Sequence, residues 1–132
     1  MAGSETAVRR WVAAAAVMGG LAVALGAFGA HGLKSRVEPE LLVTFETGVR
    51  YQFYHALALL ALALGPAPFW KRRPVHAAAW LWTGGIAVFS GSLYLLVLTG
   101  QRWLGAITPI GGVSLILGWA ALLLAARRET DE

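Results

Sequence analysis

Long uncharged apolar stretches alternate with short polar connections along the whole chain. Four stretches of this kind predict helices at about residues 11–31, 45–64, 75–98 and 103–126. An α-helix rises 1.5 Å per residue, so about 20 apolar residues cross the ~30 Å hydrocarbon core of a bilayer. The pattern therefore predicts an all-α membrane protein. We expect residues 1–132 to form a single domain, in which four transmembrane helices make one compact antiparallel bundle.

The first apolar stretch also permits another interpretation. Arg9 and Arg10 precede it, as in a secretory or twin-arginine signal, and residues 27–29 loosely resemble a cleavage site. The uncharged run at residues 11–30 is, however, longer than the roughly 7–15 apolar residues of a signal core. We therefore expect a retained membrane helix.

The second helix is expected to begin outside the membrane core. Pro39 suits the first turn of a helix. A helix from Pro39 to Leu64 would be about 39 Å long, which exceeds the thickness of the hydrocarbon core. We therefore expect a short interfacial start on the outer side, at about residues 39–46. Gly65 and Pro66 end this helix.

The composition agrees with a lipid environment and limits the available chemistry. Hydrophobic residues make up 58% of the chain and charged residues 14%, with a mean hydropathy of +0.63. A soluble domain is only about half apolar and about one quarter charged. The chain has no cysteine, which excludes disulfides, thiolate metal sites and iron–sulfur clusters. The basic residues form small groups beside apolar stretches, which indicates membrane anchoring and no nucleic-acid partner.

The basic residues also predict an orientation. One side of the predicted topology carries the larger set of Lys and Arg residues: Arg9, Arg10, Lys71, Arg72, Arg73, Arg127 and Arg128. The other side carries a smaller set: Lys34, Arg36, Arg50 and Arg102. Because positive charge favours the cytoplasmic side, we expect both termini to face the cytoplasm across an inner membrane, or the matrix if the membrane is mitochondrial.

The second apolar stretch carries polar side chains deep into the membrane. Counted back from Leu64, His55 lies about 14 Å along the helix, near the bilayer midplane. Gln52 and Tyr51 lie one turn further out. The third and fourth stretches place further polar side chains in the same outer half. The candidate pocket therefore consists of His55, Gln52, Tyr51, Ser90, Tyr94 and Thr108. We expect His55, Gln52 and Tyr51 to point into the bundle, because a polar group facing hydrocarbon loses its hydrogen bonds.

Two roles for His55 remain open at this point. It either makes a hydrogen bond between helices or binds a ligand or proton at membrane depth. His31 lies on the outer rim, about 14 Å from His55 in depth, so these two histidines are not expected to share a metal. We expect neither a metal nor a cofactor. Glu46 and Arg50 are spaced for a helical ion pair, which we expect at the same rim.

Glycine and proline predict details of helix packing. In the first stretch two sets of small residues recur every four positions: Ala16, Gly20 and Ala24, and Ala22, Gly26 and Ala30. Such faces allow close helix contacts, so we expect Gly26→Leu or Gly91→Leu to prevent stable folding. Pro109 lacks the N–H that would bond to Gly105, so it is predicted to be a kink or hinge in the fourth helix.

Several segments resemble a known family. They are GAFGAHGL (26–33), TGVRYQFYHALALL (47–60), FSGSLYLL (89–96), ITPIGG (107–112) and GW (118–119). In order and spacing they are similar to the YgdD-like family of small membrane proteins, a domain of unknown function that includes the animal mitochondrial transmembrane protein 256. The resemblance covers about residues 19–119 and implies four membrane helices in an inner or mitochondrial membrane. It implies no established activity and no functional residue.

The chemical inventory favours a function without catalysis. The sequence shows no carboxylate pair at membrane depth, no Ser-His-acid set and no short-spaced metal motif. We therefore expect an interaction or assembly partner of a larger membrane complex, with the lipid bilayer and other membrane subunits, or a second copy, as partners. The alternative is a carrier or binder of a small molecule, lipid or proton through the outer-half pocket around His55. A haem-binding subunit is less favoured, because an axial histidine pair at one depth is missing.

Overall fold

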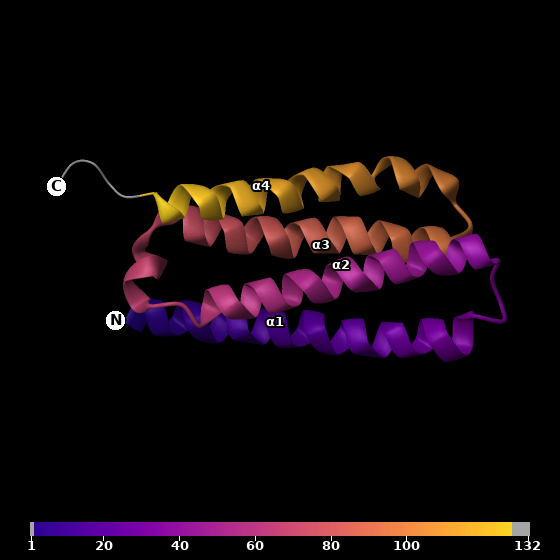
Figure 1. The fold of residues 1–132 in the computed structure, drawn as a ribbon, viewed down its shortest axis with the longest axis horizontal. Coiled ribbons are helices and arrows are strands. Elements are labelled where there is room, and N and C mark those ends of the chain that lie inside the picture. Colours follow the sequence, from indigo (N-terminus) through magenta and orange to yellow (C-terminus); the bar gives the residue numbers. More distant parts are fainter. Residues whose placement is uncertain (1, 128–132) are drawn as a thin grey trace.

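The computed structural model describes residues 2–127, which are helical apart from short connections and contain no strand. Four long helices follow one another: α1 (Ala2–Phe28), α2 (Pro39–Ala63), α3 (Arg73–Thr99) and α4 (Thr108–Ala126). Successive helices are antiparallel, so the start of α1 and the end of α4 lie at the same end of the molecule (Figure 1). We call this end the terminal end. The predicted all-helical fold class is confirmed.

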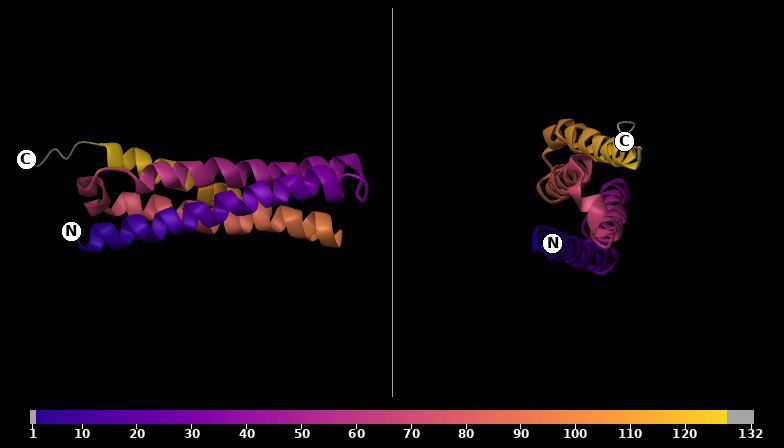
Figure 2. Two further views of the ribbon diagram at one scale, coloured as in Figure 1. Left: turned by 90° about the horizontal axis from the view of Figure 1, so that it is seen from below. Right: turned by 90° about the vertical axis from the view of Figure 1, so that its left-hand side faces the viewer.

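The four helices form an open row. α1 packs on α2, α2 on α3, and α3 on α4, whereas α1 and α4 lie at opposite edges of the row (Figure 2). Short connections make helices that are adjacent in sequence adjacent in space as well. The bundle is therefore less closed than the sequence predicted, because α1 and α4 do not complete a ring of four helices.

Three helical segments are long and apolar enough to cross a membrane. They are Glu5–Leu33, Arg73–Thr99 and Arg102–Ala126. The first of them joins α1 to a π-helical turn, Gly29–Leu33. α2 begins at Pro39 and is of similar length, but it is not one of these three segments. Arg50 and the buried polar residues in the middle turns of α2 lower its hydropathy.

The fourth helical segment changes geometry before Pro109. Arg102–Ala106 forms a 3₁₀ segment, α4 starts at Thr108, and Pro109 lies in the first turn of α4. The first N–H groups of an α-helix have no carbonyl partner, so a proline there removes no hydrogen bond. Pro109 thus marks the start of α4. The predicted kink within a continuous helix is replaced by this change from 3₁₀ to α-helical geometry.

The closest helix contacts occur at glycines other than those predicted. A Cβ atom would come within 3.0 Å of a neighbouring helix at four positions: Gly48, Gly85, Gly111 and Gly118. At Gly111 it would lie 2.8 Å from the carbonyl oxygen of Gly85 and 2.8 Å from Cα of Phe89. A Cβ at Gly91 would have nothing within 4 Å, and one at Gly26 would meet its nearest atom at 3.4 Å. A Cβ at Gly91 thus meets open space, which contradicts the close helix contact from which the effect of leucine there was predicted.

The two small-residue faces of α1 differ in their surroundings. Of the predicted face Ala22, Gly26 and Ala30, Ala22 is buried and Gly26 is half-buried, as predicted for a packing face, whereas Ala30 is exposed. The other face, formed by Ala16, Gly20 and Ala24, is exposed along its whole length. A Cβ at Gly20 would meet no atom within 4 Å. We call Ala16, Gly20 and Ala24 the free α1 face, because no other helix within residues 2–127 covers it.

Candidate functional site

The buried polar side chains of α2 connect it to its neighbours. Gln52 and His55 lie one turn apart and are only 5% and 6% exposed, as predicted for inward-facing residues. Gln52 donates from Nε2 to the carbonyl oxygen of Met18 on α1 at 2.8 Å. Its Oε1 accepts from the hydroxyl of Tyr94 on α3 at 2.7 Å. One side chain therefore joins α1, α2 and α3.

Both ring nitrogens of His55 have partners. Nδ1 lies 2.8 Å from the carbonyl oxygen of Tyr51, one turn earlier in α2. Nε2 lies 3.1 Å from Nε1 of Trp119 on α4. An indole N–H can only donate, so Nε2 accepts and Nδ1 carries the proton that is donated to Tyr51. His55 therefore links α2 to α4 as a neutral ring, an arrangement that favours its structural role over ligand or proton binding.

Trp119 is the partner of His55 that the sequence reasoning missed. Tryptophan near the end of a membrane helix is typical of an anchor at the membrane interface. Its ring instead lies 5.9 Å from that of His55 and 4.6 Å from that of Trp82 on α3. The available signal was the depth of Trp119, because it precedes the end of α4 by about two helical turns.

The remaining polar residues of the candidate pocket also bond to neighbouring helices. Ser90 Oγ donates to the carbonyl oxygen of Gly48 at 2.7 Å, which joins α3 to α2. The hydroxyls of Ser92 and Thr108 lie 2.6 Å apart, which joins α3 to the start of α4. These bonds satisfy groups that would otherwise meet hydrocarbon. The polar cluster therefore acts first as a set of connections between helices.

Tyr51 departs from the predicted inward orientation. Its side chain is 42% exposed. Its ring lies 5.0 Å from that of Phe89 on α3 and stacks on His55 at 6.4 Å. The prediction that Tyr51 points inward is therefore wrong, although its ring still covers the edge of the polar cluster. A tyrosine tolerates this edge position because its ring is apolar and only its tip is polar.

The residues predicted for the outer rim do not pair. His31 is exposed in the π-helical turn, Arg50 is exposed and Glu46 is half-buried. Glu46 and Arg50 form no ion pair, which corrects the prediction. Exposed pairs gain little free energy against the side-chain entropy that they lose. Within residues 2–127 no group of three or more His, Asp or Glu side chains is arranged to hold a metal ion.

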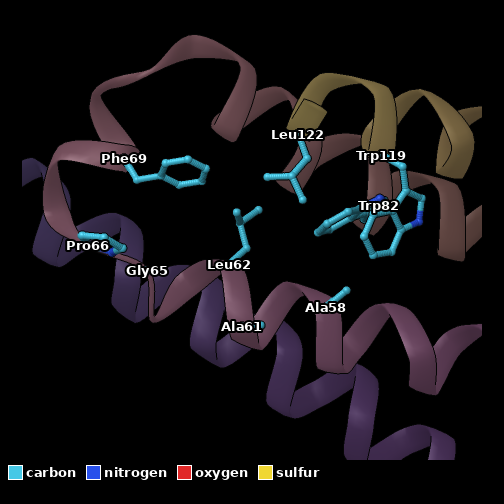
Figure 3. A pocket seen from close by; sticks show the side chains of 9 residues that line it. All are labelled: Ala58, Ala61, Leu62, Gly65, Pro66, Phe69, Trp82, Trp119 and Leu122. Carbon is cyan, nitrogen blue, oxygen red and sulfur yellow. The ribbon is translucent and has the colours of Figure 1, made fainter. Parts of the chain in front are cut away.

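An apolar cavity of about 490 Å³ lies at the terminal end. Figure 3 shows side chains from the end of α2, from the connection to α3, and from α3 and α4 around it. The lining includes Ala61, Leu62, Gly65, Phe69, Trp82 and Trp119. The sequence predicted a pocket only in the outer half of the bundle, so this cavity was not predicted. Trp119 belongs to both regions, since it donates to His55 and also lines the cavity.

Comparisons with known proteins identify relatives along most of the chain. Residues 25–112 match a family model described as "Protein of unknown function (DUF423)". The UPF0382 membrane protein YwdK of Bacillus subtilis is 47% identical over 106 residues, which cover 80% of this chain and 86% of the relative. A UPF0382 membrane protein of Haemophilus influenzae is 40% identical over 113 residues, covering 86% of this chain and 90% of the relative. No solved structure matches the chain significantly.

Proposed function

Because this chain belongs to the family described as "Protein of unknown function (DUF423)", whose relatives are named as membrane proteins, we propose that it is a four-span protein of the inner membrane that binds another membrane protein and catalyses no reaction. In this proposal α2 crosses the bilayer together with the other three helices. α2 lies between α1 and α3 and runs along both (Figure 1). Its polar residues are compatible with a span, because Gln52 and His55 are buried and bonded.

The free α1 face is the observation that supports binding to another membrane protein. In lipid, helices associate through close backbone approach, which small residues permit. Ala16, Gly20 and Ala24 offer such a surface on an edge helix, where no other helix of this chain blocks access (Figure 2). We propose that a transmembrane helix of a larger complex packs there. A carrier function through the outer-half pocket is less favoured, because Gln52 and His55 are already bonded to neighbouring helices.

Site-directed crosslinking tests this interface. The chain has no cysteine, so Gly20→Cys creates one attachment point for a photoreactive group. We expect this group to capture one defined membrane protein in native membranes, identified by mass spectrometry. Ile116→Cys is the matched control, because Ile116 is 67% exposed and belongs to α4, the helix at the opposite edge of the row (Figure 2). We expect only diffuse crosslinking there.

Two outcomes would contradict this proposal. If Gly20→Cys and Ile116→Cys capture the same proteins equally, the crosslinks report random encounters in the membrane. If Gly20→Cys captures only a second copy of this chain, the free α1 face serves self-association instead of assembly with another protein.

We also propose that both termini face the cytoplasm. The start of α1, the connection from α2 to α3 and the end of α4 lie together at the terminal end (Figure 1). These segments carry the larger set of basic residues, although Arg128 lies outside the described part of the chain. Positive charge favours the cytoplasmic side. A phosphatase that is active only after export should therefore be inactive when fused to the C-terminus. The same reporter inserted between α1 and α2 should be active, and activity at the C-terminus would refute the orientation.

A further inference from the structure

The cavity at the terminal end has the shape and chemistry of a site for a hydrocarbon chain. Its volume of about 490 Å³ lies within the range of ligand pockets in proteins. Figure 3 shows Leu62, Phe69 and Leu122 pointing into one space from three different segments, with Trp82 and Trp119 at one end of it. A polar ligand placed against these side chains would lose its hydrogen bonds. An acyl chain loses none.

The connection between α2 and α3, which lines this cavity with Gly65, Pro66 and Phe69, also carries basic residues. The 3₁₀ segment Ala67–Lys71 contributes Phe69 to the lining, and Lys71 and Arg73 follow Phe69 closely in the chain. Both are exposed, and within residues 2–127 their side chains make no hydrogen bond or ion pair. Arg72, between them, donates to the carbonyl oxygen of Arg127 at 2.8 Å. This bond ties the connection to the end of α4, whereas Lys71 and Arg73 stay exposed on the same connection.

A second cavity extends the charged region toward α1. It has a volume of about 350 Å³ and shares Gly65 with the apolar cavity. Glu5 and Arg9 of α1 also line it. Among the described residues, the lining of this second cavity contains one acidic residue, Glu5, and one basic residue, Arg9. The adjoining connection adds Lys71 and Arg73. On these described segments basic residues therefore outnumber acidic ones, which favours an anionic ligand.

We propose that the cavity between α2 and α4 binds the acyl chain of an anionic phospholipid, whose headgroup phosphate contacts Lys71 and Arg73. The apolar part of the site accounts for the chain, and the free cations account for the headgroup. Juxtamembrane Lys and Arg residues attract anionic headgroups in this way. This site lies on a different part of the molecule from the free α1 face, so it does not depend on the proposed assembly function.

Native mass spectrometry of the purified, delipidated protein tests the proposal. The protein is supplied separately with phosphatidylglycerol and with phosphatidylethanolamine of the same acyl composition. We expect one phosphatidylglycerol to be retained more strongly than phosphatidylethanolamine. The double substitution Lys71→Gln and Arg73→Gln should weaken this retention by roughly fivefold for each cation removed.

Two further variants locate the acyl chain. Ala61 is exposed and lines the cavity, so Ala61→Phe should fill it without overpacking the core and should abolish retention. Ala120→Phe is the matched control, since Ala120 is an exposed alanine of α4 outside the cavity lining. It should retain the lipid. If Ala61→Phe does not fold, as judged by circular dichroism, Ala58→Leu tests the same lining.

Three results would overturn the inference. Equal retention of the two lipids would show that the basic connection does not recognise an anionic headgroup. Unchanged retention after the cavity is filled would place the lipid elsewhere on the surface. A photoreactive group at Ala61→Cys that captures a protein and no lipid would show that a protein occupies the cavity.

Discussion

Replacing Gly111 by alanine is expected to push α3 and α4 apart and to destabilise the protein by about 1–3 kcal/mol, the usual range for overpacking. The new Cβ would lie 2.8 Å from the carbonyl oxygen of Gly85 and 2.8 Å from Cα of Phe89. Both are backbone atoms, so no change of side-chain rotamer can relieve the contact. The contact between α3 and α4 is the most extensive between any two helices of the chain. A small separation there therefore removes many favourable contacts at once.

Gly112→Ala provides the control for Gly111→Ala. It makes the same chemical change one residue later in α4, but its Cβ would meet Cδ2 of Phe89 at 3.7 Å, an ordinary van der Waals distance. Alanine also has a higher helix propensity than glycine, by about 1 kcal/mol. We expect Gly112→Ala to be at least as stable as the wild type. The midpoint of SDS-induced unfolding, followed by circular dichroism, compares the two variants, and equal midpoints would contradict the packing described here.

Sequence reasoning predicted the parts of this fold that the bilayer itself imposes. Each apolar stretch is long enough for about one bilayer crossing, and the four stretches correspond in order to the four long helices of residues 2–127. Depth and solvation also predicted that Gln52 and His55 are buried, because lipid offers a polar group no hydrogen bond. These inferences need only the distance of a residue from the end of its helix.

The rotation of each helix about its own axis could not be predicted in this way. Small residues mark several faces of α1 and α3, and only packing decides which of those faces is used. Gly91 and Gly111 look alike in sequence, yet one faces open space and the other touches the backbone of α3. The same uncertainty explains the error at Tyr51, since adjacent helical residues differ in direction by about 100°.

Side-chain contacts between segments far apart in the chain could not be predicted from the sequence either. Trp119 reads as an interfacial anchor, and only the packing of α4 against α2 and α3 shows that it donates to His55. The cavity beside Trp119 also depends on how the connection between α2 and α3 folds back over the helix ends. Neither feature has a periodic signal along the chain.

Gln52→Leu is expected to destabilise the protein by about 1–2 kcal/mol, because it removes two hydrogen bonds between helices, each worth about 0.6 kcal/mol on average in membrane proteins. Leucine has a similar size and suits the membrane interior, so most of the loss should come from the missing bonds. The carbonyl oxygen of Met18 and the hydroxyl of Tyr94 would each lose a partner. Thr83→Val is the control, since Thr83 Oγ1 bonds only within its own helix, to the carbonyl oxygen of Ala79.

A double-mutant cycle with Tyr94→Phe separates the two bonds of Gln52. The hydroxyl of Tyr94 donates only to Gln52 Oε1, so Tyr94→Phe removes that bond and leaves the bond to Met18. The unfolding free energies of the two single variants and the double variant should show a coupling of about 0.6 kcal/mol, and at most about 1.7 kcal/mol. The rest of the Gln52→Leu effect then belongs to the bond between α2 and α1.

If the effects of the two single substitutions add with no coupling, the hydrogen bond between Tyr94 and Gln52 does not stabilise the protein. In that case the polar cluster would not connect α3 to α2 through this pair, and Ser90 Oγ, which donates to the carbonyl oxygen of Gly48, would be the remaining hydrogen bond between those two helices.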